Sequence, residues 1–68
     1  MTDSIQFGDR LRELRERAKL SKAALSRRSG ISKQFLGDLE RGRRSPSLAV
    51  AKVLATALGV RLSAWEAE

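Results

Sequence analysis

The chain has 68 residues, which is enough for one small domain and too few for a second. It contains no Cys and no His, which excludes disulfides, zinc fingers, iron–sulfur sites and catalysis by a thiol or an imidazole. The eight carboxylates and the lysines form no catalytic motif. The longest uncharged stretch is far below the roughly 20 residues of a membrane helix. We therefore expect a soluble protein that is not an enzyme and needs neither metal nor cofactor.

The net charge of +6 is concentrated in the middle of the chain. Between residues 19 and 52 there are nine basic and two acidic residues, a balance of +7. A charge gathered in this way suits a polyanionic partner. Charge alone is equally compatible with a solvated surface, so the predicted elements have to decide between the two.

Apolar residues recur with helical spacing along the chain, and no segment alternates as a strand would. A first helix is predicted from about Gln6 to Arg17. Glu13 and Arg17 form a favourable i,i+4 pair on its polar side. Its apolar face carries Phe7, Leu11, Leu14 and Ala18.

Two short helices follow, each with a serine before it and a glycine after it. Ser21 is the expected N-cap of the second helix, with Ala24 and Leu25 facing inward, and Gly30 ends it. Ser32 is the expected N-cap of the third helix, which runs to about Arg41 with Leu36 and Leu39 buried, before Gly42. Because so few residues separate them, the two helices must turn sharply against each other, which is helix-turn-helix geometry.

A fourth helix is predicted with Ser45 as its cap and Pro46 in its first turn, where the missing N–H costs nothing. Gly59 ends this helix, and Ser63 is expected to cap a last short turn. The apolar stripe of the fourth helix is Val50 or Ala51, Leu54, Ala55 and Leu58. The fold class is therefore an all-α bundle of four or five helices, a single domain over residues 1–68.

Four segments carry a resemblance to a known family: residues 20–26 (LSKAALS), 30–32 (GIS), 38–48 (DLERGRRSPSL) and 57–60 (ALGV). Together they resemble the phage repressor and Cro-type helix-turn-helix proteins, which include bacterial regulators of the xenobiotic-response-element type. The similarity covers about residues 8–65, and Leu-Glu-Arg-Gly followed by Ser-Pro-Ser-Leu is its most specific part. It implies a compact lambda-repressor-like bundle whose helix-turn-helix occupies about residues 21–41.

The resemblance also implies which residues face the bases of duplex DNA. The third helix would enter the major groove with its first residues toward the base edges. Gln34 suits adenine, a pairing worth about 1–3 kcal/mol of discrimination, and Lys33 suits guanine. Phe35 would either touch the DNA or pack as core, and Asp38 would either accept from cytosine or turn toward a nearby arginine. The predicted base-contacting set is Lys33, Gln34, Phe35, Gly37 and Asp38.

Phosphate contacts and one structural ion pair follow from the same resemblance. Arg15 is expected to form a partly buried pair with Glu40 that fixes the angle of the third helix. Lys22 and Lys33 depart from the family, where many members have Gln at the first position and some phage repressors also at the second. The two lysines would straddle a phosphate or diverge. The predicted phosphate-contacting set is Ser21, Lys22, Ser32, Arg41, Arg43 and Arg44.

The implied function is a sequence-specific transcriptional regulator, with repression as the expected effect. One recognition helix covers a half-site, so a two-fold homodimer on a pseudo-palindromic operator is expected. Leu62 and Trp65 are candidates for the dimer surface, and Trp65 is equally suited to the core. The alternative is an antitoxin-type module that binds a small toxin protein as well as its own operator. Either would act in the cytoplasm, associated with a bacterial nucleoid or encoded by a phage, without a membrane.

Overall fold

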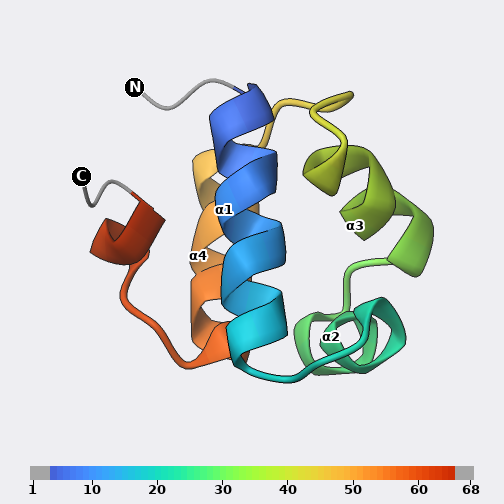
Figure 1. Cartoon of the computed structure of the whole chain (residues 1–68), viewed down its shortest axis with the longest axis vertical. Helices are drawn as coiled ribbons and strands as arrows, with labels where there is room; N and C mark the ends of the chain where they lie inside the picture. The colour runs from blue at the N-terminus through green and yellow to red at the C-terminus, as the bar shows by residue number, and fades with distance from the viewer. Residues whose placement is uncertain (1–3, 66–68) are drawn as a thin grey trace.

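The computed structural model describes residues 4–65, with side chains from residue 6 to residue 63. Helix α3 packs on α1, α2 packs on both α3 and α4, and η1 contacts α1 and α4 (Figure 1). No strand occurs in this part of the chain, which confirms the all-α prediction. The elements are the α-helices α1 (Ser4–Arg17), α2 (Lys22–Ser29), α3 (Lys33–Glu40) and α4 (Leu48–Leu58), and the 3₁₀ helix η1 (Leu62–Trp65).

The core is built from leucines that all four α-helices contribute. Each fully buried leucine stabilises the fold by roughly 1.5–3 kcal/mol relative to exposure. The largest fully buried side chains are Leu11, Leu25, Leu36, Leu39 and Leu54. Ala51, Ala55 and Leu58 complete the predicted stripe of α4. Most of the inward-facing residues expected from the sequence are therefore confirmed.

Ala18 was expected on the apolar face of α1, and this prediction is wrong. Ala18 is exposed because α1 ends at Arg17. The backbone then turns out of the helix at Lys19, whose φ is 59°. The Leu20 N–H donates to the Arg15 carbonyl at 3.1 Å, which closes a Schellman turn. The helix thus stops before Ala18 can share its buried face.

Serine side chains cap three of the helices. Ser21 and Ser32 accept from backbone N–H groups of α2 and α3 three residues on, at 3.0 and 3.1 Å, as predicted. For α4 the prediction is wrong, because Ser47 and not Ser45 accepts from the first turn, at 3.1 Å from the Val50 nitrogen. Pro46 therefore precedes the helix, and its fixed φ suits the extended approach equally well.

The glycines after the helices agree with expectation, whereas the C-terminal turn does not. Gly30 and Gly59 end α2 and α4 in the left-handed conformation, as predicted, and Gly42 adopts φ 75° just after α3. Ser63 lies inside η1 and does not cap it.

Among the described residues, no helix is long and apolar enough to cross a membrane.

Helix α3 is held unusually close to α1 at Gly8, which is buried. A Cβ at this position would overlap the Leu39 carbonyl oxygen and lie 2.8 Å from that of Glu40. Only glycine allows the end of α3 to approach the α1 backbone to this distance. This contact sets where the end of α3 sits against the bundle.

Candidate nucleic-acid interface

Helices α2 and α3 have eight residues each and are joined by only residues 30–32. Ile31 is half-buried against the core, and its N–H donates to Ser29 Oγ at 3.1 Å. The joint is therefore anchored, and α3 turns sharply away from α2. This arrangement confirms the helix-turn-helix that the caps predicted.

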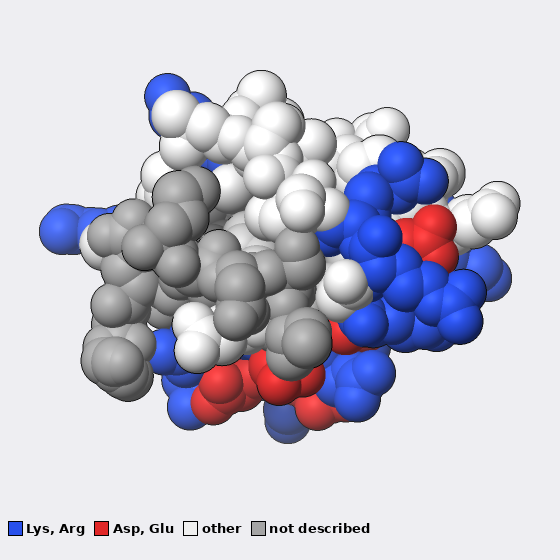
Figure 2. Space-filling model, turned by 90° about the horizontal axis from the view of Figure 1, so that it is seen from above, with Lys and Arg blue, Asp and Glu red and all other residues white. Residues whose placement is uncertain are grey.

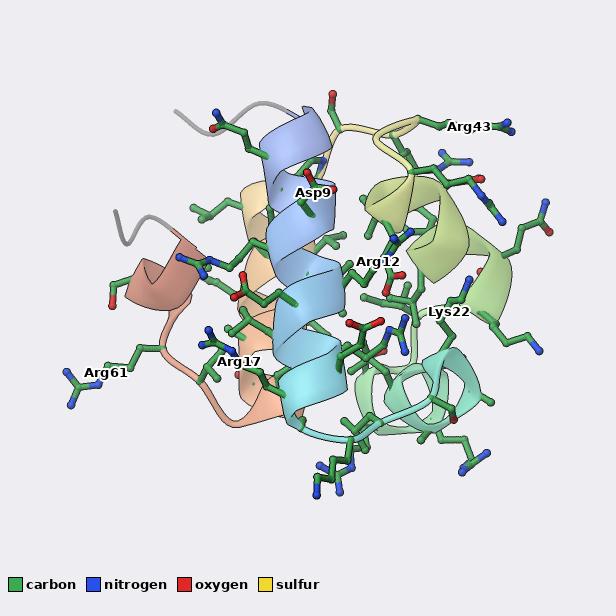
Figure 3. All side chains as sticks on the ribbon, viewed as in Figure 1. Asp9, Arg12, Arg17, Lys22, Arg43 and Arg61 are labelled. Carbon is green, nitrogen blue, oxygen red and sulfur yellow. The ribbon has the colours of Figure 1, made fainter. Side chains whose placement is uncertain are left out.

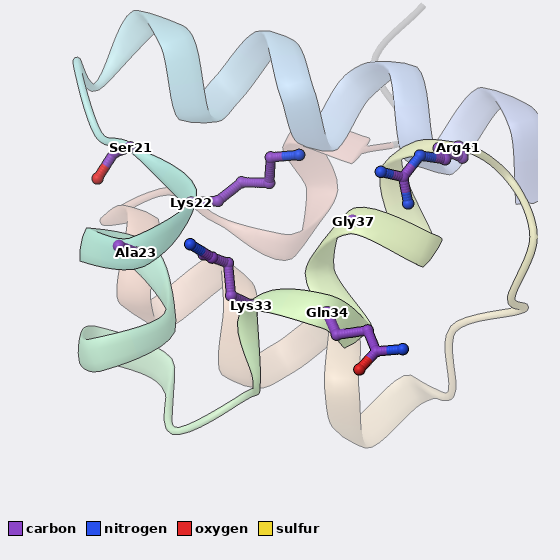
Figure 4. A pocket seen from close by; sticks show the side chains of 7 residues that line it. All are labelled: Ser21, Lys22, Ala23, Lys33, Gln34, Gly37 and Arg41. Atoms are coloured by element: carbon purple, nitrogen blue, oxygen red, sulfur yellow. The ribbon is translucent and has the colours of Figure 1, made fainter.

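An open cleft of about 470 Å³ lies between the start of α2 and the outer side of α3. It brings residues predicted to contact phosphate together with residues predicted to contact bases. In Figure 4, Lys22 and Lys33 extend toward the space between the two helices, and Gln34 points outward from α3. The lining residues are Ser21, Lys22, Ala23, Lys33, Gln34, Gly37 and Arg41.

The beginnings of both helices open onto this side of the molecule. The dipole of a helix favours an anion at its N-terminus, where backbone N–H groups lack helical partners. Lys33 and Gln34 are exposed in the first turn of α3, and Lys22 opens α2. The cleft thus combines positive charge with a neutral amide that can both donate and accept.

The turn after α3 adds three exposed arginines, Arg41, Arg43 and Arg44. Viewed from above, basic side chains gather on the side of the molecule that α3 and this turn form (Figure 2). Arg43 extends away from the body of the protein (Figure 3). The predicted phosphate-contacting residues therefore lie at the start of α2, at the start of α3, where Ser32 caps the helix, and in the turn after α3.

The three remaining residues of the predicted base-contacting set lie closer to the protein body. Phe35 is half-buried and packs against the core, and the Arg44 guanidinium lies 4.6 Å from its ring centroid. The Asp38 carboxylate is 3.6 Å from Arg41 Nη1 and 3.7 Å from Arg44 Nη2. Gly37 is buried beneath the Arg41 guanidinium. In the structure, Phe35 packs against the core and Asp38 faces two arginines, which is the second alternative predicted for each.

An ion pair joins α1 to the end of α3. Arg15 Nε donates to Glu40 Oε2 at 2.7 Å, and Arg15 Nη2 donates to Oε1 at 3.1 Å. Arg15 Nη1 also donates to the Leu20 carbonyl at 2.9 Å, just before α2. Hydrogen bonding to Glu40 raises the pKa of Arg15. The expected contact is therefore present, and it links α1, the start of α2 and the end of α3.

Arg12 also approaches Glu40, with Nε 3.6 Å from Oε1, and sequence reasoning missed it. Its spacing of three from Arg15 puts both guanidiniums within reach of one carboxylate, which is the signal that was available. With its side chain 54% exposed, Arg12 is the weaker partner.

Comparison with known proteins agrees with this geometry. Residues 6–65 match a family model described as a helix-turn-helix domain. The immunity repressor protein of Bacillus phage phi105 is 37% identical over 57 residues, which cover 84% of this chain and 40% of the repressor. An uncharacterized HTH-type transcriptional regulator of Sinorhizobium fredii is 43% identical over 53 residues, covering 78% of this chain and 69% of the regulator.

A solved structure matches almost end to end. The restriction-modification controller protein C.AhdI from Aeromonas hydrophila superimposes with a TM-score of 0.88 and 40% sequence identity, covering 91% of this chain and 94% of that one. The chain spans less than half the length of the phage repressor. The chain belongs to the helix-turn-helix family of the phage repressor and Cro type, as the matched residues, the anchored turn between α2 and α3 and these likenesses together show.

Proposed function

We propose that this protein is a sequence-specific transcriptional regulator that represses its target by placing α3 in the major groove of duplex DNA. The observation that carries this is the cleft that joins Ser21 and Lys22 to Lys33 and Gln34 on one exposed surface. The names of two similar proteins, an immunity repressor and a restriction-modification controller, support a regulatory role. The activity is binding, without a chemical step.

Within this interface, Lys33 and Gln34 read bases, because they are exposed in the first turn of α3. Gln34 pairs with adenine and Lys33 with guanine. Gly37 adds no side chain to the cleft, which allows the wall of the groove to approach α3 closely. The phosphates are held on one side by Ser21, Lys22 and Ser32 with the two helix starts, and on the other by Arg41, Arg43 and Arg44.

The functional unit is a two-fold homodimer on a pseudo-palindromic operator. One α3 covers about half of a typical site, and paired half-sites lie about 34 Å or a multiple apart. The C-terminal end, with Leu62 and Trp65, is the proposed dimer surface. Leu62 is half-buried against the core of its own chain, and the side chain of Trp65 lies outside the described residues.

Selection of bound duplexes from a random pool tests this function. The expected result is an enriched inverted repeat whose half-sites are centred about one helical turn, or a multiple of it, apart. Failure to enrich any sequence would contradict a sequence-specific regulator. Enrichment of a single unrepeated half-site would contradict the dimer and leave base reading by α3 in place.

Variants then test the assigned roles on the selected duplex and on a random duplex. Lys22→Ala should weaken binding to both and lower the slope of log affinity against log salt by about one unit. Gln34→Ala should relax the preference at one base pair and leave random binding unchanged. Arg61→Ala is the matched control, since Arg61 is an exposed cation on the side away from Lys22 (Figure 3). Equal losses from Lys22→Ala and Arg61→Ala would refute the interface.

A further inference from the structure

Two of the three arginines after α3 are turned back onto that helix. The Arg44 guanidinium lies over the Phe35 ring at 4.6 Å, and one of its nitrogens is 3.7 Å from the Asp38 carboxylate. Arg41 approaches the other oxygen of the same carboxylate at 3.6 Å. Asp38 therefore stands between two guanidiniums. Arg43 has no ion pair among the described residues and extends outward (Figure 3).

The individual contacts are of the kind that contributes little to stability. The Arg41 and Arg44 side chains are each 52% exposed, and ion pairs so open to solvent add little to stability. Together these contacts restrict the orientation of the two arginine side chains, because a shared carboxylate and an aromatic face limit where the guanidiniums can point. Asp38 is better shielded, with a side chain 21% exposed, so it is the fixed member of the group.

Restricted arginines affect matched and unmatched DNA differently. A pre-ordered side chain loses little entropy when it meets a phosphate at the one place it already points to. A mobile arginine adapts to a phosphate in any register, and such contacts supply nearly all non-specific affinity. Holding the arginines in place thus favours the register in which α3 is seated in the groove.

We propose that Asp38 is a specificity-determining residue that positions Arg41 and Arg44 for the phosphates of a matched site. This inference rests on the proposed DNA-binding function. It assigns Asp38 no base contact. Its carboxylate lowers affinity for random duplex because it withholds two arginines from adaptable phosphate contacts, and Phe35 supports it by holding Arg44 from below.

The test compares Asp38→Asn with Glu16→Gln, which removes the same charge from an exposed position on α1. Both are titrated with the selected duplex and with a random duplex of equal length. Asp38→Asn should tighten binding to the random duplex about fivefold, leave the selected duplex unchanged or weaker, and so reduce the specificity ratio at least fivefold. Equal effects of the two variants on both duplexes would refute a positioning role.

A double-mutant cycle separates positioning from direct repulsion between Asp38 and phosphate. In an Arg41→Gln, Arg44→Gln background, the effect of Asp38→Asn on random duplex should disappear, because the arginines that it releases are absent. Persistence of the effect in that background would show that Asp38 acts only by repulsion. A changed preference at one base pair in Asp38→Asn would instead make it a base contact.

A measurement without DNA completes the test. The guanidinium Nη–H protons of Arg41 and Arg44 should exchange with water more slowly than those of Arg43, because the Asp38 carboxylate faces Nη atoms of both, and Asp38→Asn should abolish the difference. Equally fast exchange of all three in the unmodified protein would refute the inference. A wild-type protein that binds no duplex would refute the proposed function and the inference with it, whereas unaltered specificity in Asp38→Asn refutes the inference alone.

Discussion

Glu40 is the one charged residue that is buried in the described part of the structure, with its side chain 2% exposed. A buried carboxylate is costly unless its oxygens are paired and hydrogen-bonded. Arg15 satisfies both oxygens, and Arg12 adds a longer contact. Since hydrogen bonding to Glu40 raises the pKa of Arg15 above an already high value, Arg15 keeps its charge in any ordinary buffer.

Arg15→Ala should lower the free energy of unfolding by about 3–5 kcal/mol, because it leaves the Glu40 charge buried with only the weaker partner. A domain of this size has a total stability of about 5 kcal/mol, so the variant should be only marginally stable, with up to about half of the molecules unfolded without denaturant. Arg12→Ala is the matched control and should cost less than about 1 kcal/mol. Urea unfolding measures both, with Arg15→Lys expected between them because lysine keeps the charge but not the paired donors. Similar losses for Arg15→Ala and Arg12→Ala would contradict this assignment.

Between elements, α1 and α3 approach each other closely at Gly8. Gly8→Ala should destabilise the protein by about 3 kcal/mol, because backbone carbonyls of α3 occupy the space of the new methyl group. Gly37→Ala is the control within α3. Its Cβ would meet only the end of the Arg41 side chain, at 3.2 Å, so it should stabilise the helix by up to about 1 kcal/mol. Thermal unfolding would distinguish them, and equal shifts in both variants would contradict the proposed packing of α1 on α3.

The start of α4 shows where sequence reasoning about an element stops. Ser45 and Ser47 are both good capping residues, and Pro46 fits either the first turn of a helix or an extended segment. Local preference does not separate these choices. The position of α4 is decided by how far the chain must travel after α3 before Ala51 and Leu54 reach the core. The caps at Ser21 and Ser32 were predicted correctly, because a pattern of buried residues follows each of them directly.

Ser47→Ala should lower the free energy of unfolding by about 1 kcal/mol, because the Val50 N–H loses its acceptor. Ser47→Asp keeps an acceptor and places a negative charge at the start of α4, so it should retain the stability of the unmodified protein. Denaturant unfolding of both variants is the measurement. A neutral effect of the alanine variant would show that another residue caps α4.

Across the whole molecule, the sequence was sufficient to predict an all-α helix-turn-helix protein with a basic surface. Helical spacing, serine caps and the position of the +7 segment depend on local sequence. The arrangement of the helices in the bundle was predicted from the resemblance to a known family. The direction of surface side chains was not predictable. Whether Asp38 faces DNA or arginines depends on how the turn after Gly42 folds back over α3, which no local pattern specifies.

We expect the surface formed by the start of α2 and by α3 to bind duplex DNA. Backbone amide chemical shifts measured during titration with the selected duplex test it residue by residue. The largest changes should occur at residues 21–23, 32–38 and 41–44, with small changes in the second half of α4. Changes centred on α4 and η1, with α3 unaffected, would contradict DNA binding by this surface.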